Sequence, residues 1–94
     1  ASIILFPNHL EERWGVSSAR DLTAADIGYL VQHKPAVLLL GTGRIQHFPQ
    51  PDVIAPAYAH QVGIEIMDTM AACRTFNVLA AEGREVVAGL ILGS

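Results

Sequence analysis

The chain of 94 residues is long enough for one small domain and no more. Hydrophobic residues make up 51% of it and charged residues 16%, so it can bury a real core and lacks the composition of a disordered chain. Its formal charge of −3, with six basic residues scattered singly, argues against nucleic acid or an anionic membrane surface as its main partner.

No segment predicts membrane insertion or secretion. The longest unbroken apolar stretch, residues 36–40, is too short to span a bilayer, and residues 1–7 lack the basic flank and the length of a signal peptide. The single cysteine excludes an internal disulfide and fits a reducing compartment. We therefore expect a soluble, cytoplasmic domain.

The first predicted element is a short strand at residues 2–6, which ends before Pro7. The connection that follows, residues 8–22, carries weak signals for regular structure. Trp14 is the one tryptophan of the sequence, and we expect it to anchor the connection against the core.

A helix is predicted over residues 23–34. Thr23 is a favoured capping residue, Asp26 places a negative charge in the first turn, and Pro35 stops the helix. One face of this helix carries the apolar residues Ile27, Leu30 and Val31.

The middle of the chain predicts a buried strand and a second helix. Residues 36–40 are apolar without alternation, as is typical of a central strand covered on both faces. After a loop rich in proline, a short helix is expected over residues 52–61, in which Pro56 is awkward unless it lies in the first turn. Gly63 fits the carboxyl cap of that helix.

The chain ends in a strand, a helix and a strand, predicted at residues 64–67, 69–81 and 85–92. Asp68 or Thr69 caps the helix and Gly83 terminates it. Strands therefore alternate with helices along the whole chain. This order predicts a layered α/β sandwich in which at least the middle strands are parallel.

Gly41 and Gly43 follow the buried strand and raise the question of a nucleotide site. A dinucleotide fingerprint needs a third glycine at the start of a helix, where the backbone approaches the pyrophosphate; Gln46 stands there instead, and no Gly-Lys-Ser/Thr motif is present. The simpler interpretation is that the glycines let the chain leave a crowded strand end sharply. No cofactor is predicted.

The helix over residues 69–81 divides into two faces at about 100° per residue. We expect a core face with Cys73 at its margin, where a small buried thiol is commoner than a nucleophile. The core face comprises Ala72, Phe76, Leu79 and Ala80, and the opposite face Met70, Arg74, Asn77 and Ala81.

A candidate ligand site combines Gly41, Gly43, Asp68, Thr69 and Arg74. In a parallel sheet, the glycine loop and the helix start would both lie at the carboxyl edge, where α/β folds place ligands. The competing interpretation is an ordinary capped helix with one surface ion pair between Asp68 and Arg74, and this interpretation is favoured because such pairs are common.

Metal binding is not predicted, because the four histidines share no ligand spacing with each other or with Cys73; they are His9, His33, His47 and His60. Phe48 lies among prolines on a predicted loop, either as a contact point for a partner or as a lid on the core.

Two segments carry a family resemblance: "LLLGTGRIQHFP" and "GIEIMDTMAACRTFNVLAAEGREVVAGLI". They resemble the Mth938-like domain family, and the block from Asp68 to Arg84 is the most specific part. The resemblance implies a three-layer α/β/α sandwich with a mixed, partly parallel sheet and an inserted β-hairpin, in which residues 8–22 or the chain ends supply the antiparallel strands. It also implies that residues 1–94 are a single such domain whose relatives usually begin with additional strand residues.

The family's relatives include a mitochondrial assembly factor for respiratory complex I, and others linked to adipocyte differentiation. Neither role comes with an agreed catalytic mechanism, so the resemblance assigns no catalytic residue. The motif positions carried over to this chain are Gly41, Gly43, Asp68, Thr69, Cys73, Arg74, Asn77 and Arg84.

Our leading hypothesis from the sequence is a non-enzymatic domain that binds a protein partner, as an assembly or scaffold factor. The alternative is a small-molecule binding protein or enzyme that uses the crevice near Gly41–Gly43, Asp68 and Arg74. A pocket with convergent polar groups at that crevice would favour the alternative. A flat, partly apolar surface around Phe48 and Tyr58 would favour the interaction domain.

Overall fold

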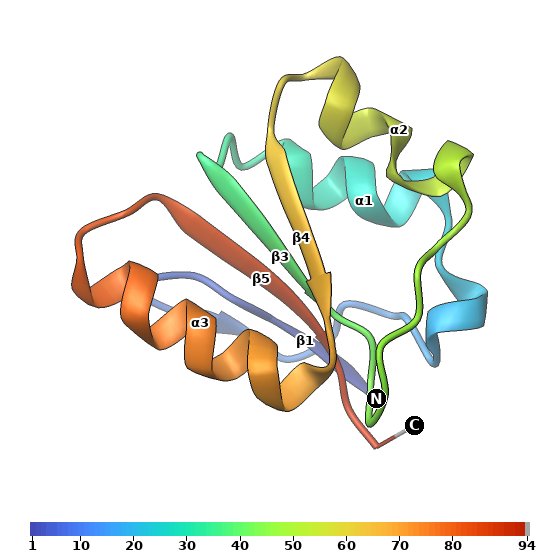
Figure 1. Cartoon of the computed structure of the whole chain (residues 1–94), viewed down its shortest axis with the longest axis horizontal. Helices are drawn as coiled ribbons and strands as arrows, with labels where there is room; N and C mark the ends of the chain where they lie inside the picture. The colour runs from blue at the N-terminus through green and yellow to red at the C-terminus, as the bar shows by residue number, and fades with distance from the viewer. Residues whose placement is uncertain (94) are drawn as a thin grey trace.

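The computed structural model describes residues 1–93 and arranges them around a mixed five-stranded sheet (Figure 1). Strand β3 pairs in parallel with both β4 and β5, whereas β1 runs antiparallel to β5 and to β2. The strands are β1 (Ser2–Leu5), β2 (Leu10–Glu11), β3 (Val37–Gly41), β4 (Gly63–Met67) and β5 (Val86–Ile91), in the order β2-β1-β5-β3-β4 across the sheet. The predicted mixed, partly parallel sheet is confirmed.

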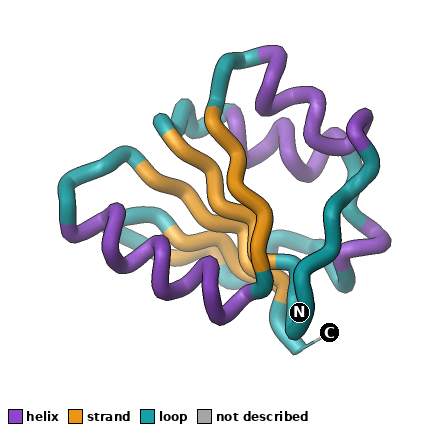
Figure 2. Tube along the Cα trace, in the orientation of Figure 1, coloured by secondary structure: helices purple, strands orange, loops and turns teal. Residues whose placement is uncertain are grey.

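Helices cover both faces of this sheet and complete the predicted three layers (Figures 1 and 2). Helices α1 and α2 pack on one face, next to each other, and α3 packs on the other against β3 and β5. The helices are α1 (Ala24–Val31), α2 (Pro51–Ala59) and α3 (Thr69–Ala81), and a short 3-10 helix, η1, spans Ala19–Asp21.

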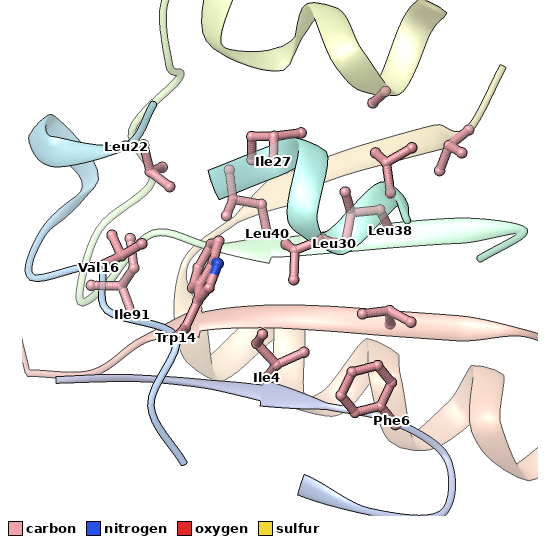
Figure 3. Close-up of a cluster of buried hydrophobic side chains, with 14 residues drawn as sticks. Ile4, Phe6, Trp14, Val16, Leu22, Ile27, Leu30, Leu38, Leu40 and Ile91 are labelled. Atoms are coloured by element: carbon pink, nitrogen blue, oxygen red, sulfur yellow. The ribbon is translucent and has the colours of Figure 1, made fainter. Parts of the chain in front are cut away.

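Each face of the sheet has its own apolar cluster. On the α1 side, Trp14 packs among the buried residues and so anchors the connection before α1, as predicted; Figure 3 shows its ring beside Ile4 and Leu30. On the α3 side, Ala72 and Phe76 are buried against β3 and β5. The predicted core face of α3 is therefore confirmed.

The ends of α1 and α3 follow from capping residues that the sequence makes visible. Thr23 and Asp26 form a reciprocal capping box at the start of α1, and the Asp68 side chain caps α3. Gly83 has a φ of +78°, a left-handed conformation that ends a helix and that glycine adopts without steric cost.

Helix α2 differs from its prediction at both ends. It begins at Pro51, which suits the first helical position because proline lacks the amide hydrogen that would be unpaired there. Pro56 lies inside the helix rather than in its first turn, and the helix ends at Ala59. Gly63 is the first residue of β4, so its prediction as the carboxyl cap is wrong.

Candidate functional site

The Gly41–Gly43 loop and the start of α3 meet at the carboxyl edge of the sheet. Thr69 N–H donates to the Gly43 carbonyl oxygen at 2.8 Å, and Gly43 N–H donates to Thr69 Oγ1 at 2.8 Å. The Thr69 hydroxyl in turn donates to the Ile91 carbonyl oxygen at 2.6 Å. One threonine therefore ties together the ends of β3 and β5 and the first turn of α3.

Thr42 fills the space between the ends of β3 and β4. Its side chain is 1% exposed, and its Oγ1 lies 2.8 Å from the Ile45 carbonyl oxygen and accepts from His47 N–H at 3.0 Å. Gln46 Nε2 donates to the Ile66 carbonyl oxygen at 2.8 Å. The chain leaves β3 toward one face and β4 toward the other, an arrangement that usually opens a ligand crevice; here the loop's own groups occupy it.

Close packing around the end of β3 requires a glycine at position 41. A Cβ on Gly41 would lie 2.9 Å from Leu90 Cδ2 and 2.9 Å from Thr69 Cα, closer than carbon atoms pack in proteins. Gly43 has a φ of +103° and so needs the conformational freedom of glycine. Both glycines have a structural reason that involves no ligand.

Asp68 and Arg74 do not form the expected surface ion pair. The Asp68 carboxylate accepts from Ala71 N–H at 2.9 Å as the cap of α3. Arg74 is exposed, and within residues 1–93 no salt bridge joins it to Asp68. The capped helix is therefore observed, without the ion pair.

None of the four cavities described for residues 1–93 is lined by the five residues of the predicted site. The structure brings Gly43 and Thr69 into contact, which the sequence left open, and keeps Arg74 apart from them on the exposed face of α3. A ligand at Gly41, Gly43, Asp68, Thr69 and Arg74 stays a prediction.

Two adjoining cavities instead open on the other side of the same loop, toward η1 and α2. They measure about 370 Å³ and about 210 Å³ and share Ala19, Arg20 and His47 in their walls. The larger is lined by Ala19, Arg20, Leu22, His47, Phe48, Pro49, Gln50, Asp52 and Val53, and the smaller by Ser18, Ala19, Arg20, Thr42 and His47.

Sequence reasoning singled out Phe48 but missed Arg20, and considered His47 only as a metal ligand. No motif joins Arg20 and His47, because they are far apart in the chain and only the tertiary fold brings η1 beside the loop. The prolines around Phe48 were the only available signal.

The remaining reactive groups form no further site. In the described part of the chain, no group of three or more His, Cys, Asp or Glu side chains could hold a metal ion. Cys73 is partly buried at the margin of the core face of α3, as predicted. The Tyr29 hydroxyl donates to Glu11 Oε1 at 2.9 Å, and this hydrogen bond, with smaller effects of desolvation and of the Glu11 charge, raises the pKa of Tyr29.

From residue 1 to residue 93, the structure contains no helix with the length and apolar character that crossing a bilayer demands.

The chain matches a protein family described as a protein of unknown function (DUF498/DUF598) over residues 1–91. Among solved structures, a Bordetella parapertussis protein is 43% identical with a TM-score of 0.89, covering 96% of this chain and 77% of its own. A Xanthomonas campestris protein is 46% identical with a TM-score of 0.85, covering 96% and 68%. A Bordetella pertussis protein described as a Mth938-like domain is 35% identical with a TM-score of 0.81, covering 96% and 72%.

The similar curated proteins include NADH dehydrogenase (ubiquinone) 1 alpha subcomplex assembly factor 3 from several vertebrates. The Danio rerio protein is 33% identical over 81 residues, which cover 84% of this chain and 47% of that protein. The Homo sapiens protein is 32% identical over 85 residues, covering 88% and 46%. The chain thus spans about half the length of these relatives.

Proposed function

Since the chain belongs to the DUF498/DUF598 family of Mth938-like domains, we propose that it is a non-enzymatic interaction domain that assists the assembly of a larger protein complex. The observation that carries this proposal is its similarity, at 32–33% identity across most of its length, to proteins named as assembly factors. An assembly factor acts by binding other proteins, so the proposal includes a protein partner. We place that activity in the cytoplasm.

Two structural features support this proposal. The carboxyl edge of the sheet is occupied by the chain's own hydrogen-bonding groups at Thr42 and Thr69. Large aromatic side chains, by contrast, face solvent on the α2 side: Phe48 is 73% exposed and Tyr58 is 64% exposed. Exposed aromatic residues are enriched in protein interfaces.

Phe48 and Tyr58 lie toward opposite ends of α2. Phe48 precedes the helix and Tyr58 is in its last turn, and at 1.5 Å per residue the helix separates them by roughly 10 Å or more. A partner that contacts both would therefore lie along α2.

Crosslinking capture from native lysate of the source organism tests the proposal. The wild-type domain is compared with a Phe48→Ser, Tyr58→Ser double variant. Val78→Ser is the matched control, because Val78 is 56% exposed on α3, across the sheet from α2. We expect a specific partner with the wild type and the control and its loss with the double variant; no partner with any folded form contradicts the proposal.

A second candidate is a ligand-binding or enzymatic crevice near Gly41–Gly43, Asp68 and Arg74. The contact between Gly43 and Thr69 favours it, because it places the loop and the helix start together at the carboxyl edge. A screen of metabolites against wild type and Arg74→Ala tests it. A compound that binds the wild type and is lost from the folded variant supports a site there, and no bound compound removes it.

A further inference from the structure

The two adjoining cavities differ in the chemistry of their walls. The smaller cavity is lined by Ser18, Arg20, Thr42 and His47 beside Ala19, with no acidic residue. The larger cavity shares Ala19, Arg20 and His47 with the smaller one. It adds the apolar side chains of Leu22, Phe48, Pro49 and Val53, together with Gln50 and Asp52. We call the two together the η1–α2 groove, with a polar end and an apolar end.

The polar end is suited to a carboxylate. The Arg20 guanidinium is permanently charged and offers a planar fork of donors that matches carboxylate geometry. Arg20 is exposed and has no salt bridge to any side chain of residues 1–93. His47 stands beside it, and its position is fixed because its backbone N–H donates to Thr42 Oγ1 at 3.0 Å.

The apolar end is suited to one hydrophobic side chain. Leu22 is buried, Val53 and Pro49 are partly buried, and Phe48 is largely exposed at the cavity wall. A volume of about 370 Å³ falls within the range of small-ligand pockets and is too small for a whole helix. It fits a single anchoring residue.

Charge favours one orientation of the occupant. Arg20 and His47 line both cavities, whereas Asp52 lines the larger one alone. A carboxylate is therefore held better in the smaller cavity, where the lining contains no acidic residue. An apolar side chain in the larger cavity, with its carboxylate at Arg20, satisfies both ends.

We propose that the η1–α2 groove binds the carboxyl-terminal apolar residue of a protein partner. This inference rests on the proposed function, because it names the part of the partner that the domain recognises. Arg20 and His47 hold the terminal carboxylate, and Leu22, Phe48 and Val53 surround the side chain.

Titration of the ¹⁵N-labelled domain with N-acetyl-Gly-Gly-Leu tests the proposal by NMR. We expect saturable shifts of the Arg20, His47 and Val53 amide signals, with binding detectable below about 10 mM for so small a probe. In the same peptide with a carboxamide end, the negative charge is absent and an NH2 donor replaces one acceptor oxygen. It should bind at least about tenfold more weakly, since hydrogen bonds to charged groups are the stronger ones.

Arg20→Gln should show a similar loss for the free acid. Arg44→Gln is its matched control, because Arg44 is an exposed arginine, in the loop that carries His47, and lines neither cavity. A well-dispersed spectrum of each variant confirms that it is folded. Equal binding of acid and carboxamide, shifts confined to another surface, or no shifts at about 10 mM would each overturn the proposal.

Two further probes separate the parts of the inference. N-acetyl-Gly-Gly-Gly keeps the carboxylate and removes the side chain, so equal binding would mean that the apolar end has no role. 4-Methylpentanoate carries the same side chain and carboxylate as a small molecule. If it binds more tightly than the peptide, the groove serves a small carboxylic acid and the peptide proposal is wrong.

The peptide titration and the lysate capture distinguish failure of the groove proposal from failure of the proposed function. A partner that both wild type and Arg20→Gln capture equally from lysate supports the interaction domain and overturns the groove as its recognition site. Peptide binding with the expected pattern, but no captured partner, supports the groove and contradicts the assembly role.

Discussion

The two sides of the Gly41–Gly43 loop differ in how their polar groups are used. We call the side toward α3 the closed side and the side toward η1 and α2 the open side. Toward α3, the Thr69 hydroxyl, Gly43 N–H and the Ile91 carbonyl oxygen are hydrogen-bonded to one another. Toward η1 and α2, Arg20 and Phe48 are exposed and line a cavity. The closed side needs particular residue types at particular positions and so leaves a motif in the sequence, whereas the open side is assembled from distant segments and leaves none.

The largest expected effect is on the packing that holds the closed side together. Phe76 is 7% exposed and docks α3 on the sheet. Phe76→Ala should lower the free energy of unfolding by about 3–5 kcal/mol, the usual cost of deleting a buried aromatic ring. Because the total stability of small domains is only about 5–15 kcal/mol, this loss should leave a large fraction of the variant unfolded at 37 °C.

Urea denaturation followed by the fluorescence of Trp14, the only tryptophan, measures the effect of Phe76→Ala. Asn77→Ala is the matched control, because Asn77 is the next residue and is exposed. Its effect should stay within about 0.5 kcal/mol. Equal stabilities for the two variants would mean that α3 is not anchored through Phe76.

Removing the Thr69 hydroxyl should weaken the closed side without changing the size of the side chain. Thr69→Val leaves Gly43 N–H and the Ile91 carbonyl oxygen without their partner, and an unsatisfied buried group costs about 1–3 kcal/mol. Thr69→Ser keeps the hydroxyl and should retain most of the stability. The same urea titration compares the two, and equal losses would show that the methyl group matters rather than the hydrogen bonds.

Adding one methyl group at Gly41 tests the crowding on the closed side. Gly41→Ala places a carbon 2.9 Å from the Thr69 backbone, which cannot move aside cheaply, so we expect a loss of about 1–3 kcal/mol. Gly28→Ala is the control in α1, where nothing lies within 4 Å of the new carbon. It should raise stability by about 0.5–1 kcal/mol because alanine favours a helix. Thermal melting of both variants measures whether stability falls for Gly41→Ala and rises for Gly28→Ala.

Most of the fold was predictable because its signals are local. The apolar run of β3, the Thr23 cap of α1 and the Gly83 end of α3 each specify one element from neighbouring residues. Strand β2 is only two residues long and exists because β1 offers it a pairing partner. No local pattern indicates such a strand, so residues 8–22 by themselves predicted neither β2 nor η1. Only the family resemblance implied antiparallel strands in this region or at the chain ends, and β1 and β2 are such strands.

The candidate site was predictable in part for the same reason. The sequence offered the glycine loop and the start of α3 as parts of one candidate site, because parallel strands bring their carboxyl ends to one edge, but it left open whether the two meet. The structure shows that they do, at Gly43 and Thr69. It could not show that Thr42 and Gln46 fill the crevice, since that depends on where their side chains find partners. The groove beside Arg20 was missed because charge and cavity come from segments that only tertiary packing joins.

The smallest expected effect concerns Asp68 and Arg74, the pair that the closed side leaves uncoupled. Asp68→Ala removes the cap on Ala71 N–H and should cost about 1 kcal/mol, while Arg74→Ala, at an exposed position, should change stability by no more than about 0.5 kcal/mol. Because no salt bridge joins the two among residues 1–93, the double variant should equal their sum within about 0.3–0.5 kcal/mol. Denaturation of all four forms completes the cycle. A larger coupling energy would mean that Asp68 and Arg74 interact in solution, and would return the closed side to consideration as a polar site.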